Sequence, residues 1–232
     1  MNTFRTFFLL LASLFLLGGC ATNGDRRDPL EPMNRGIYQF NDTVDKAIIK
    51  PVAQGYKEIL PQPVRTSVSN FFSNLDDVLV LLNDLLQFKF QQAASDLSRL
   101  IWNTTFGVAG LFDISTSMGL EKHNEDFGQT LGYWGFGNGP YLVLPILGPS
   151  SLRDTTGRFV DWQFDPVVQH PVVAERNTAT VIKVESVRAR LLETDKVLDE
   201  AALDPYVFVR DAYLQRRRAL VYDGNPPRTK FD

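Results

Sequence analysis

The feature that most constrains this chain is a segment of 26 uncharged residues from Phe127 to Leu152. Its length alone would suit a helix that spans a membrane. The segment contains six glycines and three prolines, however. Because a glycine costs about 1 kcal/mol and a proline about 3 kcal/mol inside a helix, a straight helix is excluded and irregular backbone is expected. Such backbone is tolerated at membrane depth only where it is buried in protein or lines a wet cavity.

Aromatic side chains are interleaved with the glycines of the same segment: Phe127, Tyr133, Trp134, Phe136 and Tyr141. Tyr and Trp favour the headgroup region of a bilayer, where part of the ring is in an apolar medium and its polar end is wet. We therefore expect the segment to lie at a bilayer interface or at the mouth of a channel. The alternative is a buried loop of an ordinary soluble core, in which the glycines serve tight turns.

The N-terminus has the layout of a bacterial lipoprotein signal. Arg5 precedes an uncharged apolar run over residues 7–17, and two glycines lead to Cys20, the only cysteine. The run is too short to cross a bilayer. We expect residues 1–19 to be removed, and Cys20 to carry diacylglycerol on its sulfur and an acyl chain on its amine, because two or more chains anchor a protein stably. Residues 20–27 would form a tether. Ala21, in place of an acidic residue, favours the outer membrane.

Composition and motifs argue against several other classes of protein. The chain after residue 19 has 23 basic and 27 acidic residues, hence a net charge of −4, and offers no basic field to nucleic acid. Neither of its two histidines has a second ligand at metal-binding spacing, so we expect no metal, and no cofactor besides the lipid on Cys20. There is no Gly-x-Ser-x-Gly motif. The adjacent carboxyls of Asp76 and Asp77 would diverge by about 100° on a helix, so no enzyme is expected.

Two further motifs have more than one interpretation. The Gly135–Pro140 run resembles a phosphate-binding loop, but it lacks the G-x-G-x-x-G spacing, and Pro140 has no N–H to offer. Arg210 and the residues 216–218, all arginines, form a basic cluster. The cluster either attracts lipid phosphates or complements the C-terminal end of a helix.

Apolar periodicity predicts a mostly α-helical fold. A first helix is predicted after residues 28–32, with Pro51 ending or kinking it and the run 61–63, Pro-Gln-Pro, acting as a stop. The strongest helix is predicted over 69–87, and others over 90–106, 178–200 and from Asp204-Pro205 to about Arg218. No alternating pattern is long enough to predict a sheet. Residues 28–222 are expected to form one helical domain, and 223–232 a polar tail.

Several stretches together have a specific resemblance to a known family. They are Asp28-Pro29-Leu30-Glu31-Pro32-Met33-Asn34-Arg35 with Phe40-Asn41, Leu60-Pro61-Gln62-Pro63-Val64-Arg65, Asn103-Thr104-Thr105-Phe106-Gly107, Glu125-Asp126-Phe127-Gly128-Gln129-Thr130-Leu131-Gly132, Gly139-Pro140-Tyr141 to Leu144-Pro145, Arg153-Asp154 and Asp204-Pro205-Tyr206. From about Asp28 to Tyr222, the chain resembles the VacJ/MlaA family of outer-membrane phospholipid-transport lipoproteins.

The resemblance implies a ring-like bundle of amphipathic helices embedded in the periplasmic leaflet of the outer membrane around a polar channel. Such proteins remove mislocalised phospholipid from the outer leaflet and pass it to a soluble periplasmic carrier, acting with trimeric porins, which maintains lipid asymmetry. Phe40 and Asn41 would sit on the helix that controls the channel. An apolar hairpin loop rich in glycine and proline would be the gate, comprising Gly135, Gly137, Gly139, Pro140, Tyr141, Leu142, Leu144, Pro145 and Gly148.

Sequence periodicity predicts amphipathic helices but not which way their faces point. If the apolar faces turn outward to lipid, the polar face of the 69–87 helix would line the channel through Asn70, Ser73, Asn74 and Asp77. In a soluble bundle the same faces would be reversed. Two other hypotheses are a structural lipoprotein that scaffolds a porin complex without moving lipid, and a periplasmic hydrolase with a hidden site.

Overall fold

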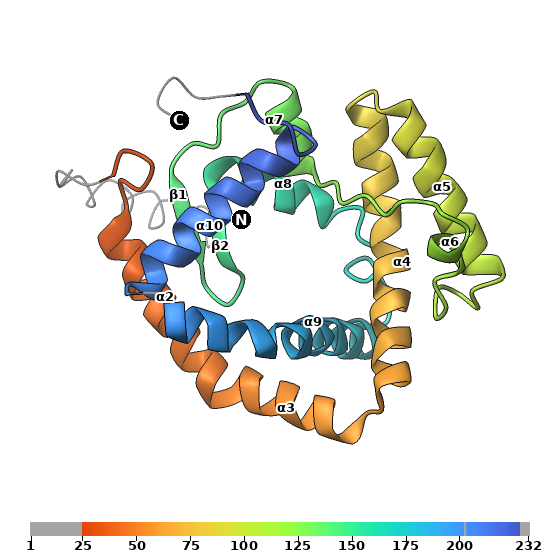
Figure 1. The fold of residues 1–232 in the computed structure, drawn as a ribbon, viewed down its shortest axis with the longest axis horizontal. Helices are drawn as coiled ribbons and strands as arrows, with labels where there is room; N and C mark the ends of the chain where they lie inside the picture. The colour runs from red at the N-terminus through yellow and green to blue at the C-terminus, as the bar shows by residue number, and fades with distance from the viewer. Residues whose placement is uncertain (1–24, 202, 228–232) are drawn as a thin grey trace, which may run out of the picture.

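The computed structural model describes residues 25–201 and 203–227; the predicted signal, Cys20 and parts of the tether and tail lie outside these ranges. The described chain is mostly α-helical, as predicted, and its helices follow one another around a ring (Figure 1). The elements are α2 (Glu31–Val44), the π-helical η1 (Asp45–Ile49), α3 (Lys50–Ile59), α4 (Gln62–Leu86), α5 (Phe90–Thr105), α6 (Ile114–Ser117), α7 (Phe127–Tyr133), β1 (Tyr141–Leu144), β2 (Gly148–Ser151), α8 (Leu152–Asp161), α9 (Val173–Ala201) and α10 (Pro205–Val221).

The first helix bends at Pro51 and does not end there. Pro51 has no N–H to donate to the carbonyl four residues earlier, and its ring crowds that carbonyl. The five residues of η1 absorb this conflict as a wider turn, in which the N–H of Lys50 donates to the carbonyl of Asp45. As a result α2, η1 and α3 form one bent rod along the lower left of the ring (Figure 1).

Two helices begin earlier than the periodicity predicted. The Pro61-Gln62-Pro63 run, predicted to be a stop, is also a start, because α4 has a proline in its first turn, where the missing N–H would be unpaired anyway. α9 begins at Val173, five residues before the predicted start. The predicted N-cap of the last helix is confirmed, since the Asp204 carboxylate accepts hydrogen bonds from the N–H groups of Tyr206 and Val207.

The uncharged segment is more ordered than the prediction of irregular backbone. It starts with α7, which Asp126 caps by accepting from the N–H of Gln129 at 2.8 Å. After a connecting loop, β1 and β2 form an antiparallel hairpin in which Tyr141 pairs with Ser151 and Leu144 with Gly148. The sheet escaped prediction because each strand has only four residues, too few for an alternating pattern to be recognised.

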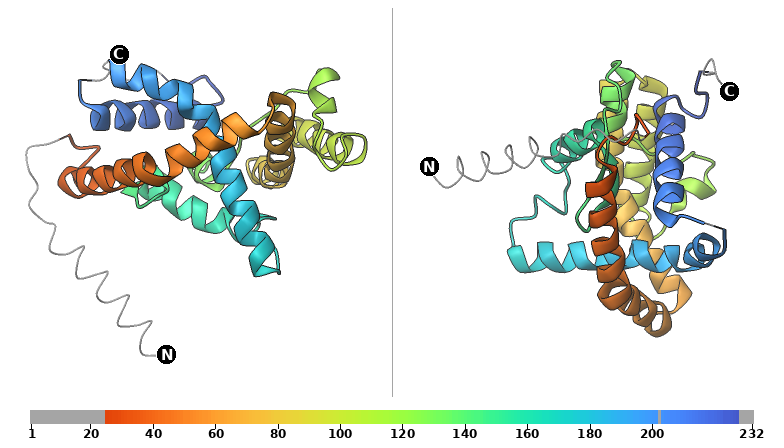
Figure 2. Two further views of the ribbon diagram at one scale, coloured as in Figure 1. Left: turned by 90° about the horizontal axis from the view of Figure 1, so that it is seen from below. Right: turned by 90° about the vertical axis from the view of Figure 1, so that its left-hand side faces the viewer.

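The longest described helix, α9, runs obliquely across the lower part of the ring in Figure 1, where its first part is foreshortened (Figure 2). Lys183 bonds the Asp76 carboxylate of α4 at 2.5 Å, and Lys57 of α3 bonds Glu193 at 2.8 Å. α9 thereby joins the first bent rod to α4 and closes one side of the ring. In the part of the chain that the structure describes, no helix is long and apolar enough to cross a membrane.

Polarity is inverted in this fold. Among the described residues, eleven apolar side chains are buried, whereas twenty-two polar or charged side chains are buried. Soluble domains ordinarily bury apolar groups and leave charges exposed. The apolar core is small and centres on Tyr141, Val143 and Tyr206. Large apolar side chains stay exposed on successive helices and on the turns and loops that follow them, and examples are Leu82, Leu85, Phe88, Phe90, Leu97, Ile101, Phe106, Trp134, Phe136, Phe159, Phe164, Val181 and Val184.

The buried polar face of α4 packs against α5 and the segment that leads into α7. Gln87 donates from Nε2 to Glu125 at 2.8 Å and to Thr130 at 3.1 Å, and the Thr130 hydroxyl donates to Asn83 at 2.7 Å. Asp84 is fully buried there. Burial and the neighbouring Asp96 carboxyl raise the pKa of Asp84 to about 8, so this carboxyl is mostly protonated at neutral pH.

Candidate functional site

The hairpin is attached to α2 by two asparagines that lie two turns apart. Asn34 donates from Nδ2 to the Tyr141 carbonyl at 3.0 Å and accepts from the Val143 N–H at 2.9 Å. Asn41 donates to the Leu144 carbonyl at 2.9 Å and accepts from the Ile146 N–H at 2.7 Å. Each side-chain amide therefore takes the place of a backbone amide of a neighbouring strand. A helix is in this way hydrogen-bonded to a sheet edge that would otherwise be open.

The tip of the hairpin is conformationally strained and apolar. Ile146 has φ +66°, a left-handed conformation that a β-branched residue rarely adopts, and Gly148 has φ +78°. The Ile146 side chain is 64% exposed, and Leu147 next to it is also exposed. The strained backbone is held by the hydrogen bond from Ile146 to Asn41. Strain of this kind persists only where the surroundings hold it, and it occurs at segments that switch between conformations.

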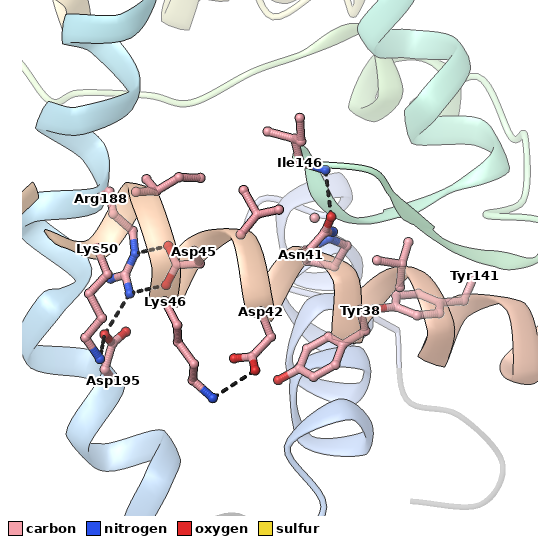
Figure 3. A pocket seen from close by; sticks show the side chains of 15 residues that line it. Tyr38, Asn41, Asp42, Asp45, Lys46, Lys50, Tyr141, Ile146, Arg188 and Asp195 are labelled. Carbon is pink, nitrogen blue, oxygen red and sulfur yellow. Dashed lines mark hydrogen bonds and ion pairs between the residues drawn. The ribbon is translucent and has the colours of Figure 1, made fainter. Parts of the chain in front are cut away.

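A pocket of about 230 Å³ lies between α2, η1, the hairpin and α9 (Figure 3). Arg188 of α9 bonds Asp45 of η1 through two hydrogen bonds of 2.7 and 2.8 Å, and it bonds Asp195 at 2.7 Å. Lys50 reaches the same Asp195 at 3.0 Å. Figure 3 shows this ionic cluster at one end of the pocket and Tyr38 and Tyr141 at the other.

The charges of this pocket are balanced and firmly paired. Lys46, Lys50 and Arg188 face Asp42, Asp45 and Asp195, so the lining has no net charge. The hydrogen bonds that Arg188 donates to the Asp45 carboxylate raise the pKa of Arg188. Burial alone would raise the pKa of Asp195, but the hydrogen bonds from Arg188 and Lys50 outweigh it and lower that pKa. The pocket thus has a wall of opposite charges and, on the hairpin, an apolar wall of Val143, Ile146 and Pro149.

The predicted gate is divided by the structure into two parts. Tyr141, Leu142, Leu144, Pro145 and Gly148 belong to the hairpin. The prediction of one hairpin from Gly135 to Gly148 is wrong in its first part, because residues 135–140 form the loop that connects α7 to β1. Of the two residues predicted to control the channel, Asn41 bonds the hairpin, whereas Phe40 is 52% exposed.

The predicted channel-lining residues do not lie together on one open surface. Asn74 and Asp77 are 4% and 1% exposed, so the prediction that they line a wet passage is wrong. Asn74 donates to the Thr104 hydroxyl at 3.0 Å, and Lys122 bonds Asp77. The reason is that the polar face of α4 is covered by α5 and the segment after it.

The other residues of that face have different surroundings. Asn70 does line a pocket, of about 360 Å³, between α3, α4 and α9. Ser73 is half-buried, and its role as a lining residue stays a prediction. The divergence of the adjacent carboxyls is confirmed, since Asp76 pairs with Lys183 of α9 while Asp77 pairs with Lys122.

Several residues of the site were not singled out by the sequence. Asn34 lies in one of the stretches that carry the family resemblance, but the sequence assigned it no role. Arg188 was one of several charged residues on the polar side of α9. The i, i+7 spacing of Asn34 and Asn41, which places both on one face of α2, was the available signal. Among the described residues, no group of three or more His, Cys, Asp or Glu side chains is placed to hold a metal ion.

A family model described as MlaA lipoprotein matches residues 26–220. The chain belongs to the MlaA lipoprotein family. The chain is 37% identical to the intermembrane phospholipid transport system lipoprotein MlaA of Escherichia coli K12, over 90% of this chain and 86% of that protein. It is 32% identical to the Haemophilus influenzae protein of the same name, over 95% and 92%.

The fold is also similar to that of a solved structure. That structure comes from work on the structural basis for maintenance of bacterial outer membrane lipid asymmetry. The TM-score is 0.74 at 34% sequence identity, with 86% of this chain and 100% of the other covered. The match to the MlaA family model therefore extends over nearly all of the described residues, and it includes the ring of helices and the hairpin.

Proposed function

We propose that this protein is a lipid-anchored component of the outer membrane that helps to maintain lipid asymmetry. It would sit in the periplasmic leaflet and move mislocalised phospholipid from the outer leaflet through the ring to a soluble periplasmic carrier. A trimeric porin would hold it in the membrane, and the acyl chains on Cys20 would anchor it. Membership of the MlaA family and the likeness to a structure from work on outer membrane lipid asymmetry support this role.

The observation that carries the proposal is the inverted polarity of the fold. Exposed apolar side chains on α4, α5, α8 and α9 would be unfavourable in water, but they suit contact with acyl chains. The exposed Trp134 and Tyr133 suit the headgroup boundary.

The pocket between α2, the hairpin and α9 suits a zwitterionic headgroup. Its three cations and three carboxylates can exchange partners with the phosphate and the ammonium of such a group without changing the net charge of the site. The hairpin presents an apolar wall to the acyl side of the lipid. Undocking of the hairpin from Asn41 would widen the entrance, and we assign to the hairpin the role of the gate.

The proposal is tested in cells that lack the native copy and carry either no replacement or one of three versions of the protein. The versions are wild type, Gly148→Val at the base of the strained tip, and Gly36→Ala as a control. An added Cβ at either glycine meets no atom within 4 Å, but only Gly148 has a positive φ. Valine at residue 148 would therefore distort the hairpin, whereas alanine at residue 36 leaves the ring unchanged.

The measurement is the fraction of cellular phospholipid that a phospholipase added outside the cells can reach. We expect this fraction to rise in the Gly148→Val strain and to stay at the wild-type level in the Gly36→Ala strain, with equal amounts of protein. Porin co-purification is followed in parallel. A scaffold would change lipid exposure only when porin association is also lost. Unchanged lipid exposure in a strain without any copy would refute the proposal.

A further inference from the structure

A second pocket, of about 830 Å³, lies between the α7–β1 loop, the start of the described chain and α10. It shares no lining residue with the pocket of Figure 3. Arg27, which lines it, is fixed to the hairpin by its carbonyl, which accepts from the Tyr141 N–H at 2.9 Å. The proposed movement of phospholipid through the ring does not require this pocket, so its occupant is a separate question.

The charged side chains that line this pocket are all arginines. Arg26 and Arg27 come from the start of the described residues, Arg153 from α8 and Arg218 from α10, and no Asp or Glu is among the lining residues. Arg27 pairs with Asp25 at 2.6 Å, and Arg153 with the buried Asp154 at 2.8 Å. Within the described residues, Arg26 has no recorded partner. The lining therefore carries more positive charge than its neighbours neutralise.

The glycine-rich loop contributes free backbone donors to the same pocket. Gly137, Asn138 and Gly139 line it, and no described residue accepts a hydrogen bond from their three successive N–H groups. Arg153 holds the loop in place, because its backbone N–H donates to the Asn138 carbonyl at 3.1 Å. Successive free N–H groups beside guanidinium groups form a concave site for an anion. Arginine also matches the geometry of phosphate oxygens through paired hydrogen bonds.

The basic cluster near the C-terminus is divided by the structure into two kinds of residue. Arg217 is buried and bonds Asp126 at 2.5 Å and Asp154 at 2.9 Å, and Arg210 is buried beside Asp28. These two arginines hold the fold together. Arg218 lines the pocket, whereas Arg216, two residues before it, is exposed and does not. Neither interpretation of the cluster anticipated the ion pairs that Arg210 and Arg217 make within the fold.

We propose that this arginine pocket, lined by Arg26, Arg27, Arg153, Arg218 and the loop 135–139, binds a phosphate group. The exposed ring of Phe136, together with Leu214 and Tyr222, gives one rim of the pocket an apolar surface. Arg26 follows Cys20 by six residues, so an extended tether places the pocket at most about 20 Å from an acylated N-terminus. Both features favour the phosphate of a phospholipid headgroup over free phosphate.

The test uses the full-length acylated protein in a nonionic detergent and measures binding by calorimetry. Three soluble probes are titrated separately: dihexanoyl phosphatidylglycerol, dihexanoyl phosphatidylcholine and inorganic phosphate. Arg26→Gln and Arg218→Gln remove pocket charges. Arg216→Gln removes the same charge from the exposed neighbour and is the matched control. Arg26 and Arg216 have no recorded partner among the described residues, so the first and third substitutions break no contact of the fold.

We expect phosphatidylglycerol to bind about tenfold more weakly to each pocket variant, and within about twofold of wild type to Arg216→Gln. Binding of phosphatidylcholine that responds to the same variants would support the site and show that the phosphate is the group recognised. Binding of inorganic phosphate with that response would support the site and assign it to free phosphate. Equal loss in all three variants, or no binding of any probe, would overturn the proposal. Neither result bears on lipid asymmetry in cells, so this proposal and the proposed function can fail separately.

Discussion

The attachment of the hairpin tip to α2 depends on one side chain, and Asn41→Ala would remove it. The change deletes the hydrogen bonds to the Leu144 carbonyl and from the Ile146 N–H, which measure 2.9 and 2.7 Å. A typical hydrogen bond contributes about 0.5–1.5 kcal/mol net, so the docked tip should lose about 2 kcal/mol. That loss corresponds to about a 30-fold larger population of the undocked tip.

Hydrogen exchange resolved at single amides reports the release of the tip. We expect exchange of the Ile146 N–H to accelerate at least about 30-fold in Asn41→Ala, because the tip undocks more often and this N–H has also lost its acceptor. The Val143 N–H, which Asn34 holds at 2.9 Å, should keep its wild-type rate. Phe40→Ala is the control, because Phe40 is exposed on the same helix and makes no recorded hydrogen bond through its side chain.

Two results would refute this reasoning. If Ile146 exchanges at the wild-type rate in Asn41→Ala, the side-chain amide does not hold the tip, and the strain at φ +66° is supported by something else. If Val143 accelerates as much as Ile146, the hairpin opens as one unit and Asn34 is not an independent attachment. The first result would also remove the basis for treating undocking from Asn41 as the opening step of the gate.

Two further predictions concern stability. Asp84 has its pKa raised to about 8, against about 3.9 in an unfolded chain, so the stability from its protonated form is complete below about pH 4 and is lost as pH rises through about 8. Between pH 5 and 8, the free energy of unfolding should therefore fall more steeply with pH in wild type than in Asp84→Asn, by at most about 1.4 kcal/mol per pH unit. Urea titrations measure the two slopes, and equal slopes would contradict this prediction. Gly157→Ala would place a Cβ 2.3 Å from the Gly128 backbone nitrogen and should cost about 1–3 kcal/mol in thermal unfolding. Gly36→Ala, which meets no atom within 4 Å, should instead stabilise by about 0.5–1 kcal/mol, and a similar melting temperature for the two variants would show that α7 and α8 are not in close contact.

Local signals were sufficient to predict most of the helices. The apolar periodicity of α5 and the Asp204-Pro205 start of α10 depend on interactions within a few residues, and both elements were predicted within a few residues of their observed bounds. The start of α4 was missed because Pro61-Gln62-Pro63 can end one helix or begin the next. That choice depends on what surrounds the run, which a single segment does not encode.

The arrangement of the site depends on contacts between distant parts of the chain, and these left little trace in the sequence. Asn34 and Tyr141 are 107 residues apart, and Asp45 and Arg188 are 143 apart. Nothing in the local pattern of either partner indicates the other. Asn74 and Asp77 show the converse error, since a polar helical face was correctly recognised but assigned to a channel when it packs against α5.

The burial of these polar faces bears on how the protein reaches its folded state. Each large apolar side chain left exposed in water forgoes about 1.5–3 kcal/mol of burial free energy, and many are exposed on α4, α5, α8 and α9. In hydrocarbon that cost disappears, because an apolar side chain then has an apolar medium around it. The buried bonds among Gln87, Glu125 and Thr130 also become harder to replace there, since no water is present to compete for them. The medium that the proposed function assigns to this protein therefore favours the observed packing over the reversed one, and folding and membrane insertion should occur as coupled steps.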